Sequence, residues 1–394
     1  MNRFTAPTAR PTPPTRFQPQ RRTMLRAMAL NGAAAMTGMT GLTACGGGGG
    51  NSVGPGTGPG TGPGTGTVSV TDRFVKVSSQ PDVSLQVRDW QRTGPTGGNV
   101  GKVGSGPTFV LLAGLGGNAR FFDSLAPALA ADGRVVAISR RGYGQSGKPL
   151  PHASATQYYE TDTLTCDLKA VLDELGLLRV VLGGHSIAGN ELTSFAGRHP
   201  ERVRGLVYLD TTFDYTVDAD AGGEEFPANG LLNTPTPTAH DNRSLQAAVA
   251  FNQRMSKDWW PPLEANLRDS LDLLSDGSVR MNTPNDVETA MDTAAHMFKP
   301  DYTAVRAPAL VMTALPSEPR DLFPWLELPL DAKTQKDATD FVQLFRRVRA
   351  ADSDKLVAAL NTPHRLTLDN CCHTDFLMAR EAEVLRAIRF MTWA

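Results

Sequence analysis

Short apolar runs rich in β-branched residues alternate along the chain with segments whose apolar residues recur at helical spacing. The runs predict strands at 68–76, 83–90, 108–113, 134–139, 179–183, 203–210, 309–314 and 365–368. The intervening segments predict helices at 120–131, 158–175, 187–198 and 380–392. This alternation is typical of an α/β fold, with an eight-stranded, mostly parallel sheet covered by helices on both faces and an antiparallel pair at its start.

Two stretches interrupt the alternation. The first, about 212–305, is rich in Asp, Asn, Pro and aromatic residues and predicts an inserted lid with helices at 244–255 and 263–274. The second, about 317–362, predicts a further insertion with a helix at about 338–350. The aromatic residues of the lid either line an apolar pocket or form the lid's own interior, and both interpretations remain open; they are Phe226, Phe251, Trp259 and Trp260.

The chain before residue 68 has a different character. Residues 1–44 carry six Arg and no acidic residue, and a weakly apolar stretch connects Arg21 and Arg22 to Cys45. The arginine pair resembles a twin-arginine export motif, and Leu42-Thr43-Ala44-Cys45 resembles a bacterial lipobox. We therefore expect an export signal at 1–44 and a periplasmic or cell-surface lipoprotein, anchored in the membrane by a lipid on Cys45.

A linker separates this signal from the folded part. The 22 residues that follow Cys45 include 12 Gly and 3 Pro, so residues 45–67 are expected to act as a flexible spacer. The folded domain is expected at 68–394.

The charge beyond the signal argues against a nucleic-acid partner. The whole chain has a formal net charge of −1, but the residues after position 44 include 33 basic and 40 acidic ones, a net of −7. No apolar run suits a multispanning membrane protein. The cysteines after the linker are Cys166, Cys371 and Cys372, which allow at most one disulfide and do not have the spacing of metal ligands.

The most informative segment is Arg179-Val180-Val181-Leu182-Gly183-Gly184-His185-Ser186-Ile187-Ala188-Gly189. A buried strand, a sharp turn with serine at its apex and a helix follow one another, which is the pattern of a nucleophile elbow. Small residues must flank the serine because the turn is tight, and Ala188 stands where the G-x-S-x-G pattern usually has glycine. Ser186 is therefore the candidate nucleophile.

With this elbow, the chain from residue 68 to 394 resembles the α/β-hydrolase family. Leu112-Ala113-Gly114-Leu115-Gly116-Gly117 is similar to the family's oxyanion loop, with Ala113 in place of the usual His. Arg141-Gly142-Tyr143-Gly144-Gln145-Ser146 resembles a further turn of the family. The resemblance implies that the backbone N–H groups of Leu115 and Ile187 form the oxyanion hole.

His373 is the candidate general base among seven histidines. It follows the last predicted strand and precedes a closing amphipathic helix, as the family's order of serine, acid and histidine requires. The other histidines fit this position less well, and the turn is expected to point the ring of His185 away from the site.

The acid of the triad has two candidates. In the slot that the family commonly uses, after the seventh strand, the chain has Ser317 with Glu318 beside it. Asp210 ends the sixth strand, where some family members carry their acid. Either carboxylate would hold the tautomer of His373, and we favour Asp210 over Glu318, with Asp321 as a remote third.

The sequence thus predicts a serine hydrolase that cleaves a small-molecule carboxylic ester through an acyl-enzyme intermediate. No metal or organic cofactor is needed for that reaction. Serine at the elbow argues against dehalogenase or epoxide-hydrolase chemistry, which uses a carboxylate nucleophile. A C–C bond hydrolase or lyase with the same triad, and a non-catalytic surface binding protein with the same fold, remain as alternatives.

Overall fold

The computed structural model describes residues 67–93, 106–217 and 221–393. The predicted export signal, the arginine pair and the lipidation site at Cys45 lie outside these residues. None of the helices in the described ranges combines the length and apolar character that a membrane-spanning segment needs.

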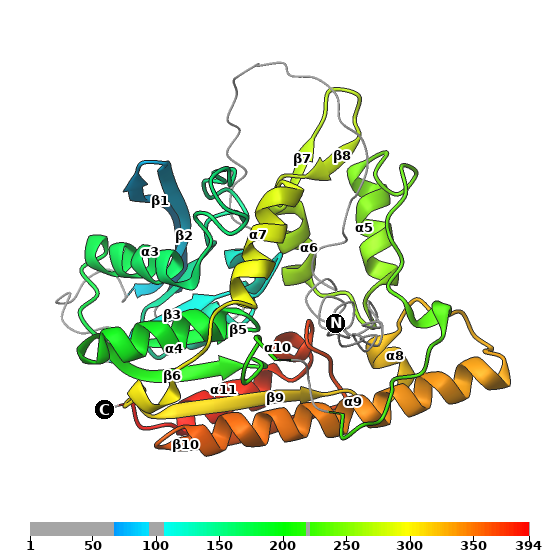
Figure 1. The fold of residues 1–394 in the computed structure, drawn as a ribbon. Helices are drawn as coiled ribbons and strands as arrows, with labels where there is room; N and C mark the ends of the chain where they lie inside the picture. The colour runs from blue at the N-terminus through cyan, green and yellow to red at the C-terminus, as the bar shows by residue number, and fades with distance from the viewer. Residues whose placement is uncertain (1–66, 94–105, 218–220, 394) are drawn as a thin grey trace, which may run out of the picture.

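An eight-stranded sheet forms the centre of the molecule, as the sequence predicts (Figure 1). Its order is β1-β2-β4-β3-β5-β6-β9-β10. The strands are β1 (Thr67–Ser79), β2 (Asp82–Thr93), β3 (Phe109–Leu112), β4 (Val135–Ile138), β5 (Val180–His185), β6 (Val203–Leu209), β9 (Ala309–Leu315) and β10 (Pro363–Asp369). β2 runs antiparallel to both its neighbours, and the remaining pairs are parallel. The carboxyl ends of the parallel strands therefore meet at one edge of the sheet.

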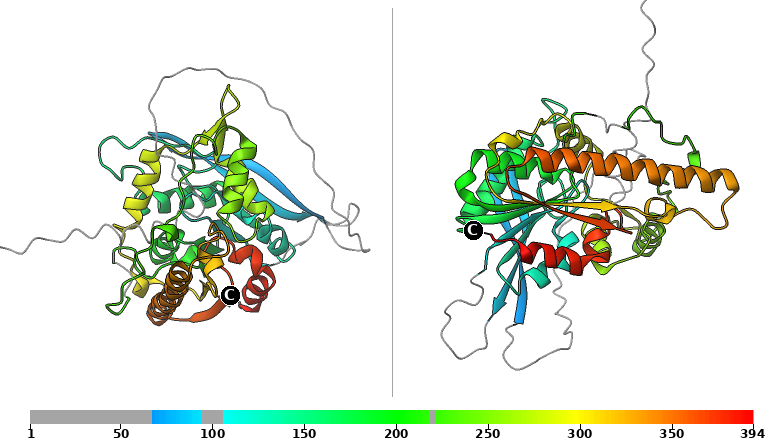
Figure 2. Two further views of the ribbon diagram at one scale, coloured as in Figure 1. Left: turned by 90° about the vertical axis from the view of Figure 1, so that its right-hand side faces the viewer. Right: turned by 90° about the horizontal axis from the view of Figure 1, so that it is seen from below.

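Helices cover both faces of the sheet (Figure 2). One face packs against α2 (Leu125–Leu129), α10 (Phe376–Ala379) and α11 (Glu381–Phe390). The other packs against α3 (Thr161–Glu174), α4 (Ala188–Arg198) and the carboxyl-terminal part of α9 (Ala332–Ala359). Because helices pack on both faces of the sheet, every residue of strands β3, β4 and β5 is buried.

Three predicted helices differ from the structure. The helix expected at 120–131 is split into a 3₁₀ turn at Ala119–Phe122 and the short α2. The helix expected at 263–274 ends at Asp269, and the chain continues into strand β7 (Leu271–Leu273). The helix expected at about 338–350 is the 28-residue α9.

The extra length of α9 has local causes. The side chain of Asp331 caps the first turn by accepting from the backbone N–H groups of Lys333 and Thr334. Ion pairs four residues apart, such as Lys333 with Asp337, and a small apolar cluster around Ala338 support its first turns. The amino-terminal part of α9 therefore projects beyond the sheet (Figure 1).

The chain between β6 and β9 forms a cap on the side of the sheet where the parallel strands end (Figure 1). The cap contains α5 (Leu245–Arg254), α6 (Pro261–Asp269), the hairpin of β7 and β8 (Val279–Met281), and α7 (Asn285–Ala295). A short helix, α8 (Pro319–Leu322), follows β9. Four 3₁₀ turns complete the described elements, at Ala119–Phe122, Pro200–Arg202, Gly230–Leu232 and Tyr302–Ala304.

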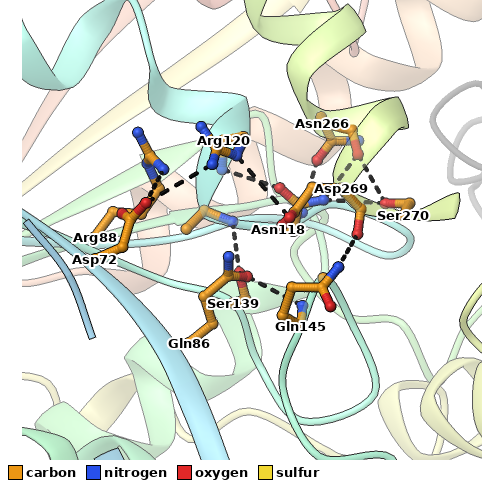
Figure 3. A network of polar contacts seen from close by, with 12 residues as sticks. Asp72, Gln86, Arg88, Asn118, Arg120, Ser139, Gln145, Asn266, Asp269 and Ser270 are labelled. Carbon is orange, nitrogen blue, oxygen red and sulfur yellow. Dashed lines mark hydrogen bonds and ion pairs between the residues drawn. The ribbon is translucent and has the colours of Figure 1, made fainter. Parts of the chain in front are cut away.

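Buried amide groups fasten α6 to the body (Figure 3). The Asn118 backbone N–H donates to Asn266 Oδ1 at 2.8 Å, and Asn118 Nδ2 donates to the Asn266 carbonyl at 2.9 Å and to Ser270 Oγ at 3.0 Å. On the body side, Ser139 Oγ accepts from the backbone N–H of Ala119 and donates to Gln86 Oε1. Because Asn118 follows the predicted oxyanion loop directly, this network joins the cap to that loop.

Candidate active site

Ser186 lies at the apex of the turn between β5 and α4. Its φ of 56° is in the left-handed region that residues with a side chain seldom adopt. A Cβ at Gly184 would lie 2.6 Å from Leu192 Cδ1, and one at Gly189 would lie 2.2 Å from Thr211 Oγ1. Gly184 and Gly189 therefore have no room for a side chain in this tight turn, whereas the methyl group of Ala188 fits at the start of α4. This is the strained geometry that exposes the serine side chain of a nucleophile elbow.

His373 follows β10 and contacts the carboxylate at the end of β6. The His373 Nδ1 and Asp210 Oδ2 atoms are 2.6 Å apart, within a short hydrogen bond. Asp210 Oδ1 accepts from the backbone N–H of Ala314 at 3.0 Å, so the adjacent strand orients the carboxylate. The structure thus brings Asp210 and His373 together from positions 163 residues apart.

A buried arginine completes the surroundings of Asp210. Arg349, on α9, donates from Nη2 to Asp210 Oδ1 at 2.9 Å, and its exposed fraction is 5%. Burial alone would raise the pKa of Asp210, but the Arg349 charge and the His373 hydrogen bond outweigh it and hold the pKa well below its usual range. Asp210 is therefore a carboxylate that stays ionised in the site.

The alternative acid lies elsewhere. The side chain of Glu318 is 55% exposed and pairs with Lys257 Nζ at 2.8 Å. Asp321 is buried, pairs with the same Nζ at 2.6 Å, and accepts from the backbone N–H groups of Ser317 and Glu318. Both carboxylates thus join the cap to the loop after β9, and neither takes the place beside His373 that Asp210 occupies.

The predicted oxyanion loop lies close to the serine. A Cβ at Gly114 would lie 2.8 Å from Ser186 Cβ, so this position has no room for a side chain. Behind the loop, Arg140 Nη2 donates to the Gly114 carbonyl at 2.7 Å, and Arg140 Nη1 donates to Glu191 Oε1 at 2.6 Å. With Ala113 in place of histidine, a buried ion pair between the β4 end and α4 thus supports the loop.

His185 lies in the site, contrary to the expectation that its ring points away. Its ring centroid is 4.4 Å from that of His373 and 5.0 Å from that of Phe121. Its Nε2 is 2.9 Å from the His373 carbonyl oxygen, which requires Nε2 to carry the proton. Burial, together with the charge of His373, lowers the pKa of His185 well below its ordinary value, so the ring is neutral.

A cavity of about 630 Å³, including space open to solvent, lies between the body and the cap. On the body side it is lined by residues of the elbow, of the loop after β10 and of the predicted oxyanion loop and the turn after it. Among them are Ser186, His185, His373, Leu115 and Phe121. On the cap side it is lined by Asn252, Ser256, Trp259, Leu263, Asn266 and Leu267. Ser186 and His373 therefore line one cavity, in which a small molecule can meet both.

The lid aromatics divide between the two interpretations that the sequence left open. Trp259 lines the cavity, whereas Phe251 is buried in α5 and Phe226 packs against Phe341 of α9. Trp260 packs against the apolar core on the α11 face of the sheet.

Several residues near the site carry no local motif. The contact of Arg349 with Asp210 cannot be recognised from the sequence, because the two residues are 139 positions apart. Tyr215 is buried, which raises its pKa, and its hydroxyl oxygen accepts from the backbone N–H of Thr212 at 3.3 Å. The free cysteines are placed differently: Cys166 is exposed, Cys371 is buried and Cys372 is half-buried.

Comparison with known proteins supports this architecture. Residues 107–244 match the family model described as alpha/beta hydrolase fold. Bifunctional epoxide hydrolase 2 of Mus musculus is 35% identical over 113 residues, which are 28% of this chain and 20% of the relative. The sn-1-specific diacylglycerol lipase of Mus musculus is 35% identical over 136 residues, 34% of this chain and 42% of the relative.

The chain thus matches between 20% and 42% of the length of these curated relatives. Among solved structures, the thioesterase domain from the curacin biosynthetic pathway aligns with a TM-score of 0.55 and 15% identity, over 82% of this chain and 100% of that domain. The protein therefore has the α/β-hydrolase fold.

Proposed function

We propose that this protein is a serine hydrolase of the α/β-hydrolase family and that it cleaves carboxylic esters. The observation that carries the proposal is the hydrogen bond between His373 Nδ1 and the buried Asp210 Oδ2, beside a cavity that both His373 and Ser186 line. A histidine oriented by an ionised carboxylate, beside a serine on a strained turn, is the arrangement that activates a serine nucleophile.

In the proposed reaction, Ser186 Oγ attacks the acyl carbon while His373 Nε2 takes the hydroxyl proton. Asp210 holds the proton on Nδ1, which fixes the tautomer, and it stabilises the imidazolium that forms. The N–H groups of Leu115 and Ile187 are assigned to the developing oxyanion. When the bond to the alkoxy oxygen breaks, His373 returns its proton to the departing alcohol.

The second half of the cycle uses water as the nucleophile. His373 takes a proton from the water as its oxygen bonds to the acyl carbon, and the bond from that carbon to Ser186 Oγ then breaks. The carboxylic acid leaves, and the proton on His373 returns to Ser186.

The experiment that tests the proposal is labelling with a fluorophosphonate probe, which reacts with activated serines. We expect stoichiometric labelling of Ser186, identified by mass spectrometry, and turnover of short-chain nitrophenyl esters. Ser186→Ala should abolish both without lowering the melting temperature, because alanine keeps the Cβ that the elbow already holds. Absence of labelling would indicate a non-catalytic binding protein, and labelling without ester turnover would favour cleavage of a C–C bond.

The proposed localisation rests on the sequence. We propose that the mature protein is a lipoprotein, anchored through Cys45 and exported by the twin-arginine route. Cys45→Ser should move the protein from the membrane fraction to the soluble fraction, and replacement of both Arg21 and Arg22 by Lys should block export. Continued membrane association of the Cys45 variant would contradict the anchor.

A further inference from the structure

None of the described residues that line the cavity beside Ser186 has a charged side chain that could pair with a charged ligand. We propose that the protein selects esters whose cavity-bound portion is uncharged, and that it discriminates against esters carrying a carboxylate there. This inference rests on the proposed function, since it names the substrate class of the same site.

The first observation is the uncharged composition of the cavity lining. None of the described residues that line the cavity is Asp, Glu, Lys or Arg. Leu115, Phe121, Leu263, Leu267 and Trp259 supply apolar surface. The polar groups on the cap side are the neutral side chains of Asn252, Ser256 and Asn266.

The two histidines in the lining do not provide a cation for the ligand. His185 is neutral, because its burial and the proximity of His373 lower its pKa well below the ordinary value. His373 must be neutral to accept the serine proton, so a substrate carboxylate that paired with its protonated form would block the reaction.

Two cations close to the cavity, Lys257 and Arg140, are held by other groups. Lys257 follows Ser256 directly, but its Nζ lies 2.8 Å from Glu318 Oε1 and 2.6 Å from Asp321 Oδ1. Arg140, behind the predicted oxyanion loop, is bound to Glu191 and to the Gly114 carbonyl. Neither can turn to a ligand without leaving a carboxylate or a buried carbonyl without its partner.

The polar groups of the cap suit a neutral hydrogen-bonding ligand. Asn252 and Ser256 lie one turn apart at the end of α5, and the Ser256 hydroxyl donates to the Asn252 carbonyl at 3.2 Å. The Asn252 Nδ2 group donates to the Ala248 carbonyl at 2.9 Å. These groups can satisfy a carbonyl or hydroxyl of an ester, whereas an ionised carboxylate moved from water into such a space loses far more solvation than they return.

The test uses matched pairs of esters at pH 8. On the acyl side, 4-nitrophenyl hexanoate is compared with mono-4-nitrophenyl adipate, in which a carboxylate replaces the terminal methyl group. On the alcohol side, phenyl acetate is compared with 4-carboxyphenyl acetate. After subtraction of the spontaneous rate, we expect kcat/KM to fall by about 100-fold or more for the charged member of at least one pair.

Two variants locate the effect in the cavity. Asn252→Lys places a cation in the lining and should reduce the preference for the neutral ester at least tenfold in the same pair. Gln253→Lys adds the same charge to the exposed neighbouring position on α5 and should leave the ratio within twofold of the wild type. Melting temperature and fluorophosphonate labelling show whether each variant is folded and carries an active serine.

Each outcome has a separate meaning. Hydrolysis of both charged esters within threefold of their neutral partners would overturn the inference and leave the proposed function standing. A neutral preference that Gln253→Lys changes as much as Asn252→Lys would place its origin outside the cavity and also overturn it. If the wild type hydrolyses none of the four esters and is not labelled, the proposed function itself fails.

Discussion

The two walls of the cavity both have an uncharged described lining but differ in what supports it. Behind the body wall lie buried ion pairs between neighbouring strands and helices, such as Asp210 with Arg349 and Arg140 with Glu191. The cap wall contributes amide, hydroxyl and apolar groups, and Lys257 beside it is paired with carboxylates that follow β9. The contrast suggests a division of tasks, in which the body fixes the geometry of the reacting groups and the cap selects the ligand.

The physical reason lies in what each wall must do. A base, an acid and an oxyanion donor have to keep their positions to within a fraction of an ångström, and buried ion pairs with good hydrogen bonds are directional enough to hold them. A wall that binds an uncharged ligand needs complementary shape and little desolvation. Charges on that wall would either require counter-ions or repel the ligand.

The largest expected effect tests the buried charges behind the body wall. Asp210→Asn should lower kcat by about 10⁴-fold, because the amide leaves His373 in the wrong tautomer and without a negative partner for its cation. Ester hydrolysis measures the loss, and melting curves must accompany it because the substitution also removes the partner of Arg349. Glu318→Gln is the matched control and should change kcat less than about tenfold. The reverse ranking would assign the acid role to Glu318.

A second test removes the arginine behind the acid. Arg349→Met should lower the free energy of unfolding at pH 7 by about 3–5 kcal/mol, because it leaves the buried Asp210 carboxylate without its cation. The control is Arg347→Met, at another position of α9. It breaks an exposed pair with Glu224 and should lower the free energy of unfolding by less than about 1 kcal/mol.

The pH dependence of the Arg349 effect follows from the lowered pKa of Asp210. The stability that an acid with a lowered pKa contributes is fully present above its unfolded pKa of about 3.9 and is lost as pH falls below that value toward the folded pKa. In Arg349→Met the buried Asp210 loses the main cause of its lowered pKa and takes up a proton at a higher pH than in the wild type, so the difference in stability between the two proteins should shrink as pH falls from 7 to 4. Urea unfolding at these pH values measures it, and an equal difference at all of them would contradict the assigned ion pair.

A third test concerns the close approach of the oxyanion loop. Gly114→Ala would place a Cβ 2.8 Å from Ser186 Cβ and 2.9 Å from His185 Nδ1, so the loop must move. We expect kcat to fall by about 10²- to 10³-fold, as when an oxyanion donor is lost, with KM changing much less. Gly230→Ala is the control, because no atom lies within 4 Å of its added Cβ. Equal activity of the two variants would place the oxyanion site elsewhere.

The body of the protein could be predicted from the sequence more completely than the cap. The eight strands, their antiparallel start and the covering helices were predicted because each has a local hydrophobic period, and the structure confirms them. Ser186 could be predicted from the local motif of the elbow, and His373 from the order of serine, acid and histidine in the family that the sequence resembles. Arg349 was not found, because its contact with Asp210 spans an insertion with no sequence signal of its own.

The cap was predicted less well than the body. Its existence follows from the broken alternation of strands and helices, but α6 ends five residues earlier than expected, where the chain enters the β7–β8 hairpin. Which of its aromatics would line the cavity could not be predicted, because Trp259 and Trp260 are adjacent and have the same side chain. The position of α6, which follows both residues, involves the long-range contact between Asn266 and Asn118.

The smallest expected effect concerns Glu288, a carboxyl group in the cap that does not line the cavity. Burial, together with the negative charge of Asp292, raises the pKa of Glu288 on α7 to about 7. For an acid with a raised pKa, the folded state holds the proton more tightly, so stability is lost as pH rises from the unfolded pKa of about 4.3 to about 7. Glu288→Gln should then be more stable than the wild type by about 1–3 kcal/mol at pH 8 and nearly equal to it at pH 4. Asp286→Asn, at an exposed position of the same helix, should show no such dependence on pH. If Glu288→Gln gains nothing at pH 8, the carboxylate has a partner there and the cap holds a paired charge like those of the body wall.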